Sequence, residues 1–419
     1  MRRVTRPALR GPGRGPRDAP HHTAPTGERE PPVAYPAIIR LLLTLSILSA
    51  AALSPVVEAA PTPIPSPPQL ALHSYVLMDA TTGKILAAHD ANTREQPASL
   101  TKMLTLYIAF QEIKAGQIHL DDEVTVSKKA WRTGGSRMFL QVGTKVPVKD
   151  LIQGIIVQSG NDAAVALAQD VAGSTATFVQ MMNQTAARLG MKSSHFADVD
   201  GLPVPDHYST AHDLAILARA LIRDFPEYYH YFKEKVYTYN HIKQYNRNRL
   251  LWRDPSVDGL KTGHTEEAGY CLVSSAKRGG MRLIAVVMGA KSDDGRTRDN
   301  EALLNYGFRF FETRVVYKAG RPITQARVWK GAAQSVPLGV AHDLKVTLPR
   351  GQARELRPDI QVHEPILAPV TQGTPYGTVQ AAVGKTVLAR EPLIALRGVA
   401  VGSLWQRLKD DALLYFNND

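Results

Sequence analysis

The sequence contains a single cysteine among its 419 residues, and this scarcity limits the chemistry open to the chain. Cys271 has no second cysteine with which it could form an intramolecular disulfide, even in an oxidising compartment. It lies in an apolar run, and a catalytic cysteine would need an electropositive setting that its neighbours do not supply. We therefore expect a buried, structural thiol.

Metal-ligand patterns and nucleic-acid-binding patterns are also missing. The 13 histidines include no His-Glu-x-x-His pair, so we expect no metal and no cofactor. The net charge is +12, but residues 1–60 hold eight arginines against four acidic residues, and the remaining positive charge is scattered. This distribution argues against nucleic acid as a partner and favours a mildly basic surface for an anionic polymer such as cell-wall glycopeptide.

The apolar stretch at 41–53 is too short to span a bilayer comfortably. Basic Arg40 precedes it and small residues follow it, which predicts a secretory signal within a leader at 1–60, cleaved near Ala59 or Ala60. An uncleaved anchor is the alternative. Residues 61–71 then read as an extended Pro-rich linker, and the protein is expected to be exported.

Three short strings stand out in order along the chain: Ser-Leu-Thr-Lys at 99–102, Ser-Gly-Asn at 159–161 and Lys-Thr-Gly at 261–263. Together they supply a nucleophilic hydroxyl, two lysines, a second serine, an amide and a glycine that lets backbone approach a ligand. Each string alone is a weak signal. The three in this order resemble the signature of penicillin-binding proteins and class A β-lactamases.

Local context supports the first string. Apolar residues follow Ser99 at helical spacing and Gly116 provides a C-terminal stop, which predicts a helix that starts at Ser99. A serine in the first turn lies at the positive end of the helix, and Lys102 lies one turn above it on the same face. A hydroxyl nucleophile and its proton acceptor require this geometry.

A second Ser-x-x-Lys match, from Ser274 to Lys277, shows how little the pattern means alone. The runs at 270–276 and 281–288, on either side of a Gly-Gly turn, predict a β-hairpin. Residues three apart on a strand point to opposite faces, so Ser274 and Lys277 cannot cooperate. The middle string, in contrast, lies between helical segments at 151–158 and 162–172.

Longer stretches resemble the low-molecular-mass penicillin-binding proteins that act as D-alanyl-D-alanine carboxypeptidases, serine peptidase family S11, and most closely those of the 5 and 6 type. The matching stretches are 96–103, 158–163, 257–265 and 307–313. The similarity extends from about Leu72 to the C-terminus. One departure is Gly160, where the family often has alanine, a change small enough to leave the roles of its neighbours intact.

The resemblance implies an α+β fold with a helix-sheet-helix DD-peptidase domain at 72–313, a small all-β domain at 314–397 and an amphipathic helix at 398–419. The patterns of the sequence agree with this layout. They predict a first hairpin at 74–78 and 84–88, helices to about Ile222 and a closing helix at 299–311. Strands of the second domain are expected at 326–329, 344–348, 360–363, 378–382, 386–388 and 393–396.

The resemblance also assigns catalytic roles. Ser99 is the nucleophile, acylated by a peptidoglycan stem peptide ending in D-alanyl-D-alanine or by a β-lactam inhibitor. Lys102 is its base, which must be neutral, and burial beside the second cation Lys261 would lower its pKa. Ser159 relays a proton to the leaving amine, and Asn161 orients Lys102 and the substrate amide.

Substrate binding falls to a second group. Lys261 and Gly263 belong to the strand that positions the peptide. The resemblance also implies that the main-chain amides of Ser99 and His264 form the oxyanion hole. Thr262 and Arg296 occupy the family positions that read the terminal carboxylate, and Arg247 is a second candidate cation.

Two other functions share parts of this pattern. A class A β-lactamase needs a glutamate that activates the deacylating water, and the only glutamates between Ser159 and Lys261 are Glu227 and Glu234, neither in a comparable loop. We therefore expect penicillin to inhibit this protein rather than to be consumed quickly. A non-catalytic wall-binding protein would have no need of the intact nucleophile and lysines.

The C-terminal segment shows an apolar stripe at helical spacing, made of Leu404, Trp405, Leu408, Ala412, Tyr415 and Phe416. We expect this helix to lie on the periplasmic face of the inner membrane, and a helix packed on the β domain is the alternative. Its acidic residues outnumber Arg407 and Lys409, so burial of the apolar face must be the main force. The sequence gives no indication of oligomeric state.

Overall fold

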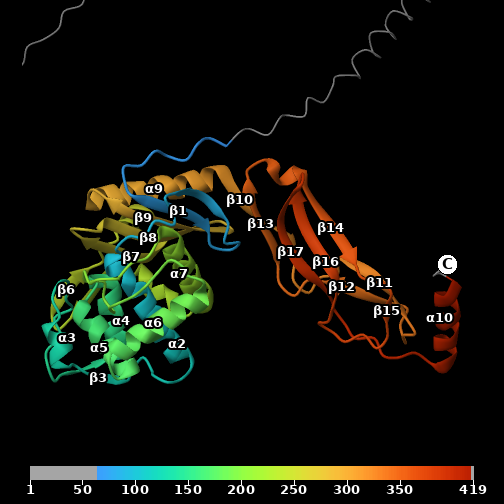
Figure 1. Ribbon diagram of the computed structural model, residues 1–419, viewed down its shortest axis with the longest axis horizontal. Helices are drawn as coiled ribbons and strands as arrows, with labels where there is room; N and C mark the ends of the chain where they lie inside the picture. Colours follow the sequence, from blue (N-terminus) through green and yellow to red (C-terminus); the bar gives the residue numbers. More distant parts are fainter. Residues whose placement is uncertain (1–63, 417–419) are drawn as a thin grey trace, which may run out of the picture. The chain divides into compact units, whose positions relative to one another are not determined.

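The computed structural model describes residues 64–416. The predicted signal sequence lies outside the described residues. The described part contains a mixed helix-and-sheet portion, an all-β portion and a final helix (Figure 1). This agrees with the α+β fold class expected from the sequence.

A five-stranded antiparallel sheet forms the centre of the first portion, in the order β2-β1-β9-β8-β7. The N-terminal strands join strands that lie far along the chain, so that Val76 pairs with Val286. Both expected hairpins are present. The strands are β1 (Ser74–Asp79), β2 (Ile85–His89), β7 (Val257–Thr265), β8 (Gly269–Arg278) and β9 (Met281–Ala290).

A layer of helices covers one face of this sheet (Figure 1). Its central helix follows the 3₁₀ turn η1 (Ala98–Thr101) and is buried from Lys102 to Phe110, as befits a helix that is apolar on nearly all sides. The helices of the layer are α2 (Lys102–Lys114), α4 (Val148–Gln153), the π-helical η2 (Gly154–Gln158), α5 (Asn161–Ala172), α6 (Thr175–Leu189) and α7 (Ala211–Asp224).

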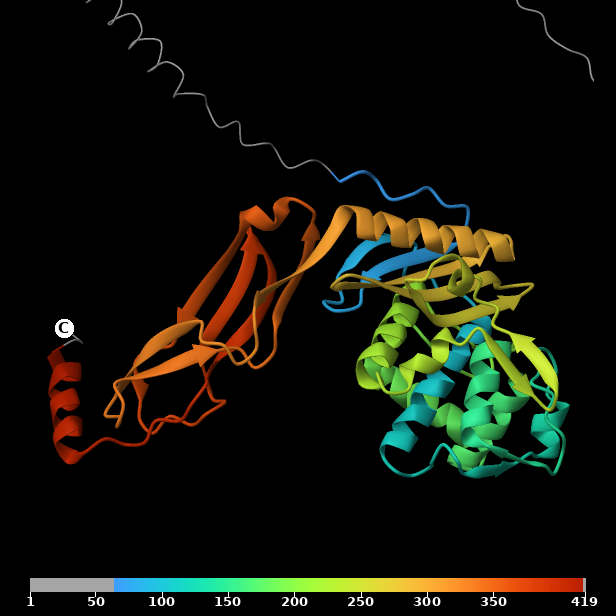
Figure 2. The same cartoon turned by 180° about the vertical axis from the view of Figure 1, so that it is seen from behind.

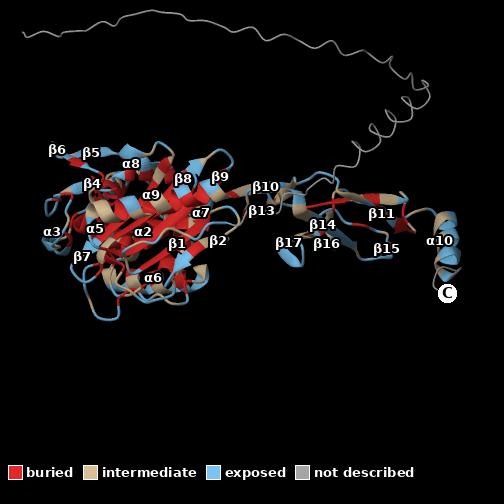
Figure 3. Cartoon of the chain, turned by 90° about the horizontal axis from the view of Figure 1, so that it is seen from above, coloured by how far each residue is buried: buried red, intermediate tan, exposed pale blue. Residues whose placement is uncertain are grey.

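Helix α9 (Asp293–Phe310) covers the opposite face of the sheet (Figure 2). The strands between the two layers are largely buried (Figure 3). The helix begins six residues before the predicted start because Ser292 caps it, with Oγ accepting the Gly295 N–H at 3.0 Å. Its first turn is polar, so apolar periodicity does not reveal it.

Shorter elements connect and border these layers. They are β3 (Glu123–Thr125), α3 (Lys128–Arg132), β4 (Lys145–Pro147), η3 (Tyr229–Lys233), β5 (Val236–Tyr239), β6 (Ile242–Tyr245) and α8 (Leu250–Arg253). Strands β3 and β4 pair with each other, as do β5 and β6.

The all-β portion has a six-stranded sheet in the order β14-β16-β17-β12-β11-β15 and a two-stranded sheet of β10 and β13. Strands predicted at 386–388 and 393–396 are one continuous strand, β17, and the short β12 was not predicted. The elements are β10 (Phe311–Tyr317), β11 (Thr324–Trp329), β12 (Ser335–Gly339), β13 (Leu344–Pro349), η4 (Gln352–Glu355), β14 (Leu356–Val362), β15 (Ile366–Leu367), β16 (Pro375–Val383), β17 (Thr386–Ala395) and the final helix α10 (Leu404–Phe416).

Candidate active site

The three strings meet at one cavity of about 860 Å³. Ser99 lies in η1 before α2, Ser159 follows η2, and Lys261 lies on β7, the edge strand of the sheet. The two lysines are buried and hydrogen-bond to the cavity serines. The other eight predicted site residues line the cavity: Ser99, Ser159, Asn161, Arg247, Thr262, Gly263, His264 and Arg296.

Ser99 and Lys102 form a hydrogen-bonded pair, as the sequence predicts. Lys102 Nζ donates to Ser99 Oγ at 2.9 Å and to the backbone carbonyl of Asp200. The helix starts with a 3₁₀ turn, in which side chains three residues apart eclipse each other, so the two groups lie one above the other. The arrangement presents a hydroxyl with an amine ready to take its proton.

The protonation of Lys102 is set mainly by its burial, since its side chain is 0% exposed. Burial lowers the pKa of Lys102 to about 8, while the carboxylates of Asp200 and Asp198 act in the opposite direction. The positive charge of Arg247 lowers the pKa of Lys102 further, an effect that the sequence predicts for Lys261. A neutral, proton-accepting fraction of Lys102 therefore exists near neutral pH.

Lys261 and Ser159 form a second pair. Lys261 Nζ donates to Ser159 Oγ at 2.8 Å and to the carbonyl of Thr262 at 3.1 Å. Burial holds the pKa of Lys261 well below its usual value, and the positive charge of Lys102 lowers it further. Ser159 has a left-handed backbone (φ 65°), a conformation that costs free energy in a residue other than glycine.

Asn161 is held by a neighbouring loop and not by Lys102. Its Nδ2 donates to the Gly134 carbonyl at 2.8 Å. Within the described residues, the Lys102 amine bonds to Ser99 and to the Asp200 carbonyl and not to Asn161, the residue that the family resemblance implies would orient it. Asn161 Oδ1 is buried at the cavity and has no hydrogen-bond partner in the described part of the chain. It is thus available to a substrate N–H.

Arg296 is only 5% exposed, and its terminal nitrogens already have protein partners. Nη1 donates to the carbonyls of Gly263 at 2.9 Å and Cys271 at 3.3 Å, and Nη2 forms an ion pair with Asp293. Both terminal nitrogens of Arg296 are therefore already engaged by protein groups. Arg296 contributes charge and holds the Lys-Thr-Gly strand, while Arg247 lines the same cavity with a pKa that burial lowers.

Gly263 allows strand β7 to approach the nucleophile. A Cβ at this position would lie 2.9 Å from the Pro97 carbonyl oxygen and 3.2 Å from the Ala98 side chain. The ring of His264 packs against that of Tyr270 in a tilted arrangement, with 4.0 Å between centroids and 34° between planes, which gives the side chain a packing role. The absence of a side chain at Gly263 brings the backbone after Lys261 against the turn that carries Ser99.

The two glutamates considered for a β-lactamase lie away from the cavity. Glu227 forms an ion pair with Lys114 at 3.5 Å, and Glu234 accepts hydrogen bonds from Gln153. Neither is among the cavity-lining residues, whose described carboxylates are those of Asp200 and Asp293. Among residues 64–416, no glutamate lines the cavity where it could activate a deacylating water in the class A manner.

Sequence reasoning missed the segment from Asp198 to His207. Asp200 contributes the carbonyl that holds Lys102, and His207 contacts Thr101, one of the two residues between Ser99 and Lys102. A carbonyl contact leaves no trace in residue type, and a lone histidine in a polar loop has no distinguishing pattern. Neither could be found without the folded chain.

Comparison with known proteins agrees with this geometry. A family model described as peptidase S11, D-alanyl-D-alanine carboxypeptidase, matches residues 62–292. A second model, described as the C-terminal domain of penicillin-binding protein 5, matches residues 311–401.

Individual relatives are similar over most of the chain. D-alanyl-D-alanine carboxypeptidase DacC of Escherichia coli K12 is 45% identical over 358 residues, 84% of this chain and 90% of the relative. DacA of the same organism is 43% identical over 365 residues, 85% of this chain and 91% of the relative. The crystal structure of penicillin binding protein 5 from Haemophilus influenzae is 42% identical, with a TM-score of 0.75, and covers 80% of this chain and 99% of that one.

Proposed function

Since the chain belongs to the peptidase S11 family of D-alanyl-D-alanine carboxypeptidases, we propose that it removes the terminal D-alanine from peptidoglycan pentapeptides by acyl transfer to Ser99. It is a serine-type hydrolase that β-lactams inhibit covalently. The observation that carries the residue assignment is the buried amine of Lys102, 2.9 Å from the Ser99 hydroxyl at the floor of the cavity.

Acylation begins when neutral Lys102 takes the proton of Ser99 and the Ser99 oxygen attacks the carbonyl carbon of the penultimate D-alanine. A C–O bond forms and the carbonyl oxygen becomes negative, facing the N–H groups of Ser99 and His264. The C–N bond then breaks, and the leaving amine takes a proton through Ser159, which Lys261 contacts at 2.8 Å. Water hydrolyses the resulting ester and frees Ser99.

Binding relies on polar groups that converge on the cavity. The unpartnered Oδ1 of Asn161 accepts a hydrogen bond from a backbone N–H of the bound peptide, next to the bond that is cleaved. The positive charges of Arg296 and Arg247, together with Thr262, favour a substrate that ends in a carboxylate. A β-lactam presents the same pair of groups, an amide carbonyl and a nearby carboxylate, and forms the same ester with Ser99.

Membrane association through the C-terminal helix is the second part of the proposal. Among residues 64–416 no helix combines the length and hydrophobicity needed to cross a bilayer. The apolar residues of α10 face outward instead (Figure 3), with Leu404 70%, Trp405 79% and Leu408 63% exposed. A helix packed on the β domain would bury them, so a peripheral position on the periplasmic face of the inner membrane is the better account.

The deciding experiment measures D-alanine release from a synthetic pentapeptide together with labelling by a fluorescent penicillin. We expect release of one D-alanine per peptide, and a label that persists and is blocked by unlabelled penicillin. A label that disappears within seconds while penicillin is hydrolysed would favour a β-lactamase. Binding of stem peptide without either reaction would favour a non-catalytic wall-binding protein.

A further inference from the structure

The peptide bond that precedes the nucleophile is held by an unusual set of contacts. The carbonyl oxygen of Ala98 accepts a hydrogen bond from Thr101 Oγ1 at 2.8 Å, and Thr101 is completely buried. Ala98 itself has a left-handed backbone (φ 47°), which costs free energy in a residue other than glycine. Surrounding contacts must therefore maintain this conformation.

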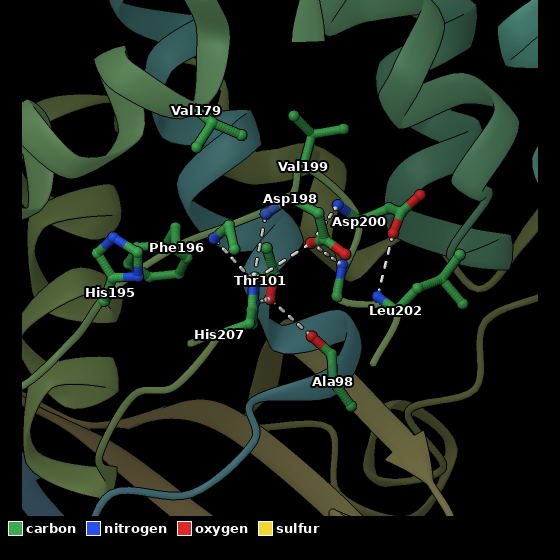
Figure 4. A network of polar contacts seen from close by, with 12 residues as sticks. Ala98, Thr101, Val179, His195, Phe196, Asp198, Val199, Asp200, Leu202 and His207 are labelled. Atoms are coloured by element: carbon green, nitrogen blue, oxygen red, sulfur yellow. Dashed lines mark hydrogen bonds and ion pairs between the residues drawn. The ribbon is translucent and has the colours of Figure 1, made fainter. Parts of the chain in front are cut away.

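His207 extends this contact into a relay (Figure 4). Its Nδ1 accepts the backbone N–H groups of Ala197 at 3.1 Å and Asp198 at 3.3 Å, so the ring proton must be on Nε2. Nε2 lies 2.7 Å from Thr101 Oγ1, and the Thr101 hydroxyl donates its own proton to the Ala98 carbonyl. Nε2–H of His207 therefore donates to Thr101 Oγ1, which in turn donates to Ala98. Burial lowers the pKa of His207 to about 4, which agrees with a neutral ring.

Gly201 closes the other side of the Ala98 carbonyl. A Cβ built on Gly201 (φ 84°) would lie 1.9 Å from the carbonyl oxygen, so only glycine can occupy this position. Asp198 fixes the turn, because its Oδ1 accepts the N–H of Gly201 at 2.8 Å. The neighbouring Asp200 carbonyl accepts a hydrogen bond from the Lys102 amine. One loop therefore contacts both Lys102 and the peptide unit that joins Ala98 to Ser99.

We propose that His207 and Thr101 are positioning residues for acyl transfer, which hold the Ala98–Ser99 peptide so that the Ser99 N–H points at the developing oxyanion. A peptide unit is planar and trans, so its C=O and N–H point in opposite directions and fixing one fixes the other. Ser99 is the second residue of its helical turn, where the N–H has no carbonyl partner within the helix. The inference rests on the proposed function, because it presupposes an oxyanion at this amide.

The first test compares Thr101→Val with Thr101→Ser in the full mature chain, using the rate constant for acylation by a fluorescent penicillin. Loss of the hydroxyl should lower that rate constant about 10- to 100-fold, somewhat less than complete removal of an oxyanion donor, with little change in the non-covalent dissociation constant. Thr101→Ser, which keeps the hydroxyl, should recover the rate to within about threefold of the original protein.

Thr105→Val is the matched control. Thr105 lies one turn further along the same helix, is equally buried, and donates to the Val199 carbonyl at 2.7 Å in the same loop. It should lower the melting temperature as Thr101→Val does, yet leave the acylation rate within about twofold of the original, since it does not touch the Ala98–Ser99 peptide. Equal loss of rate in the two variants, or none in either, would overturn the proposal.

His207 gives an independent arm should Thr101→Val fail to fold. His207→Gln retains an N–H that reaches Thr101, whereas His207→Leu removes it, so only the leucine variant should acylate slowly. If both acylate at the original rate, the relay has no catalytic role. Failure of the proposed function is seen separately, as absence of labelling in the unsubstituted protein.

Discussion

The amine of Lys102 lies 2.9 Å from the hydroxyl oxygen of Ser99, at the start of a helix whose every residue from Lys102 to Phe110 is buried. Burying a lysine costs free energy unless its amine is hydrogen-bonded, and the Asp200 carbonyl accepts a second hydrogen bond from Lys102 Nζ. The pair therefore combines a hydroxyl that lines the cavity with an amine whose pKa burial lowers, as the proposed nucleophile and base require. Five predictions follow from this site and its surroundings.

Ser99→Ala should abolish covalent labelling by fluorescent penicillin, because no other hydroxyl in the cavity is paired with Lys102. The control is Ser274→Ala, which alters the second Ser-x-x-Lys match. Ser274 is buried on β8 and donates to Asn300, so this change costs stability but should leave labelling intact. Labelling of the Ser99→Ala variant at the original rate would refute the nucleophile assignment.

The rate of acylation should rise with pH and level off above about pH 8, because the base must be neutral and burial lowers the pKa of Lys102 to about 8. Below that value we expect about a tenfold loss for each pH unit. The measurement is the second-order rate constant for penicillin acylation between pH 6 and 9.5. A rate constant that is flat over this range would show that Lys102 is not the titrating base.

Arg296→Ala should slow release of D-alanine more than Arg296→Lys, because lysine keeps the positive charge near the substrate carboxylate. Both variants also lose the hydrogen bonds to the carbonyls of Gly263 and Cys271, so both should be less stable. Arg298→Ala, an exposed neighbour paired with Asp294, is the control. If a peptide amide without the carboxylate loses as much activity as the free acid, Arg296 does not read that carboxylate.

His207 should make the protein less stable in mild acid. Its pKa is lowered from 6.5 to about 4 by burial, so the folded state resists protonation and the unfolded state does not. Stability is complete above about pH 6.5 and decreases as the pH falls towards 4, by about 3 kcal/mol in all. Urea unfolding at pH 7 and 4.5 should show a smaller decrease for His207→Gln. The exposed His119→Gln variant should behave like the original protein.

Removal of residues 404–419 should release the protein from membranes while leaving D-alanine release unchanged. The apolar side chains of α10 are exposed, and the helix meets the β domain at Lys330, which bonds to Asp410 and Asp411. The intact mature protein should resist extraction by high salt and dissolve in detergent. Extraction by salt alone would indicate an electrostatic attachment, and loss of activity on truncation would favour a helix packed on the β domain.

Much of the site could be predicted from the sequence because its chemistry resides in local patterns. The 3.6-residue spacing after Ser99 predicts the helix that carries Lys102. The two-residue period of a strand excludes Ser274 and Lys277 as a catalytic pair, because their side chains point to opposite faces. The order of the three strings indicated the family. The predicted start of helix α9 lies six residues after its true start at Asp293, because a polar first turn has no apolar period to detect.

The folded chain alone decided what surrounds these groups. The contacts from Lys102 to Asp200 and from Thr101 to His207 join residues about one hundred positions apart, and such contacts depend on how the helices pack and not on any local period. Packing likewise decided that Arg296 faces protein carbonyls and Asp293. The sequence by itself therefore determined which groups are candidates for the reaction, since residue type fixes chemistry. Tertiary structure decided their protonation and orientation, since these arise from burial and from backbone groups that every residue shares.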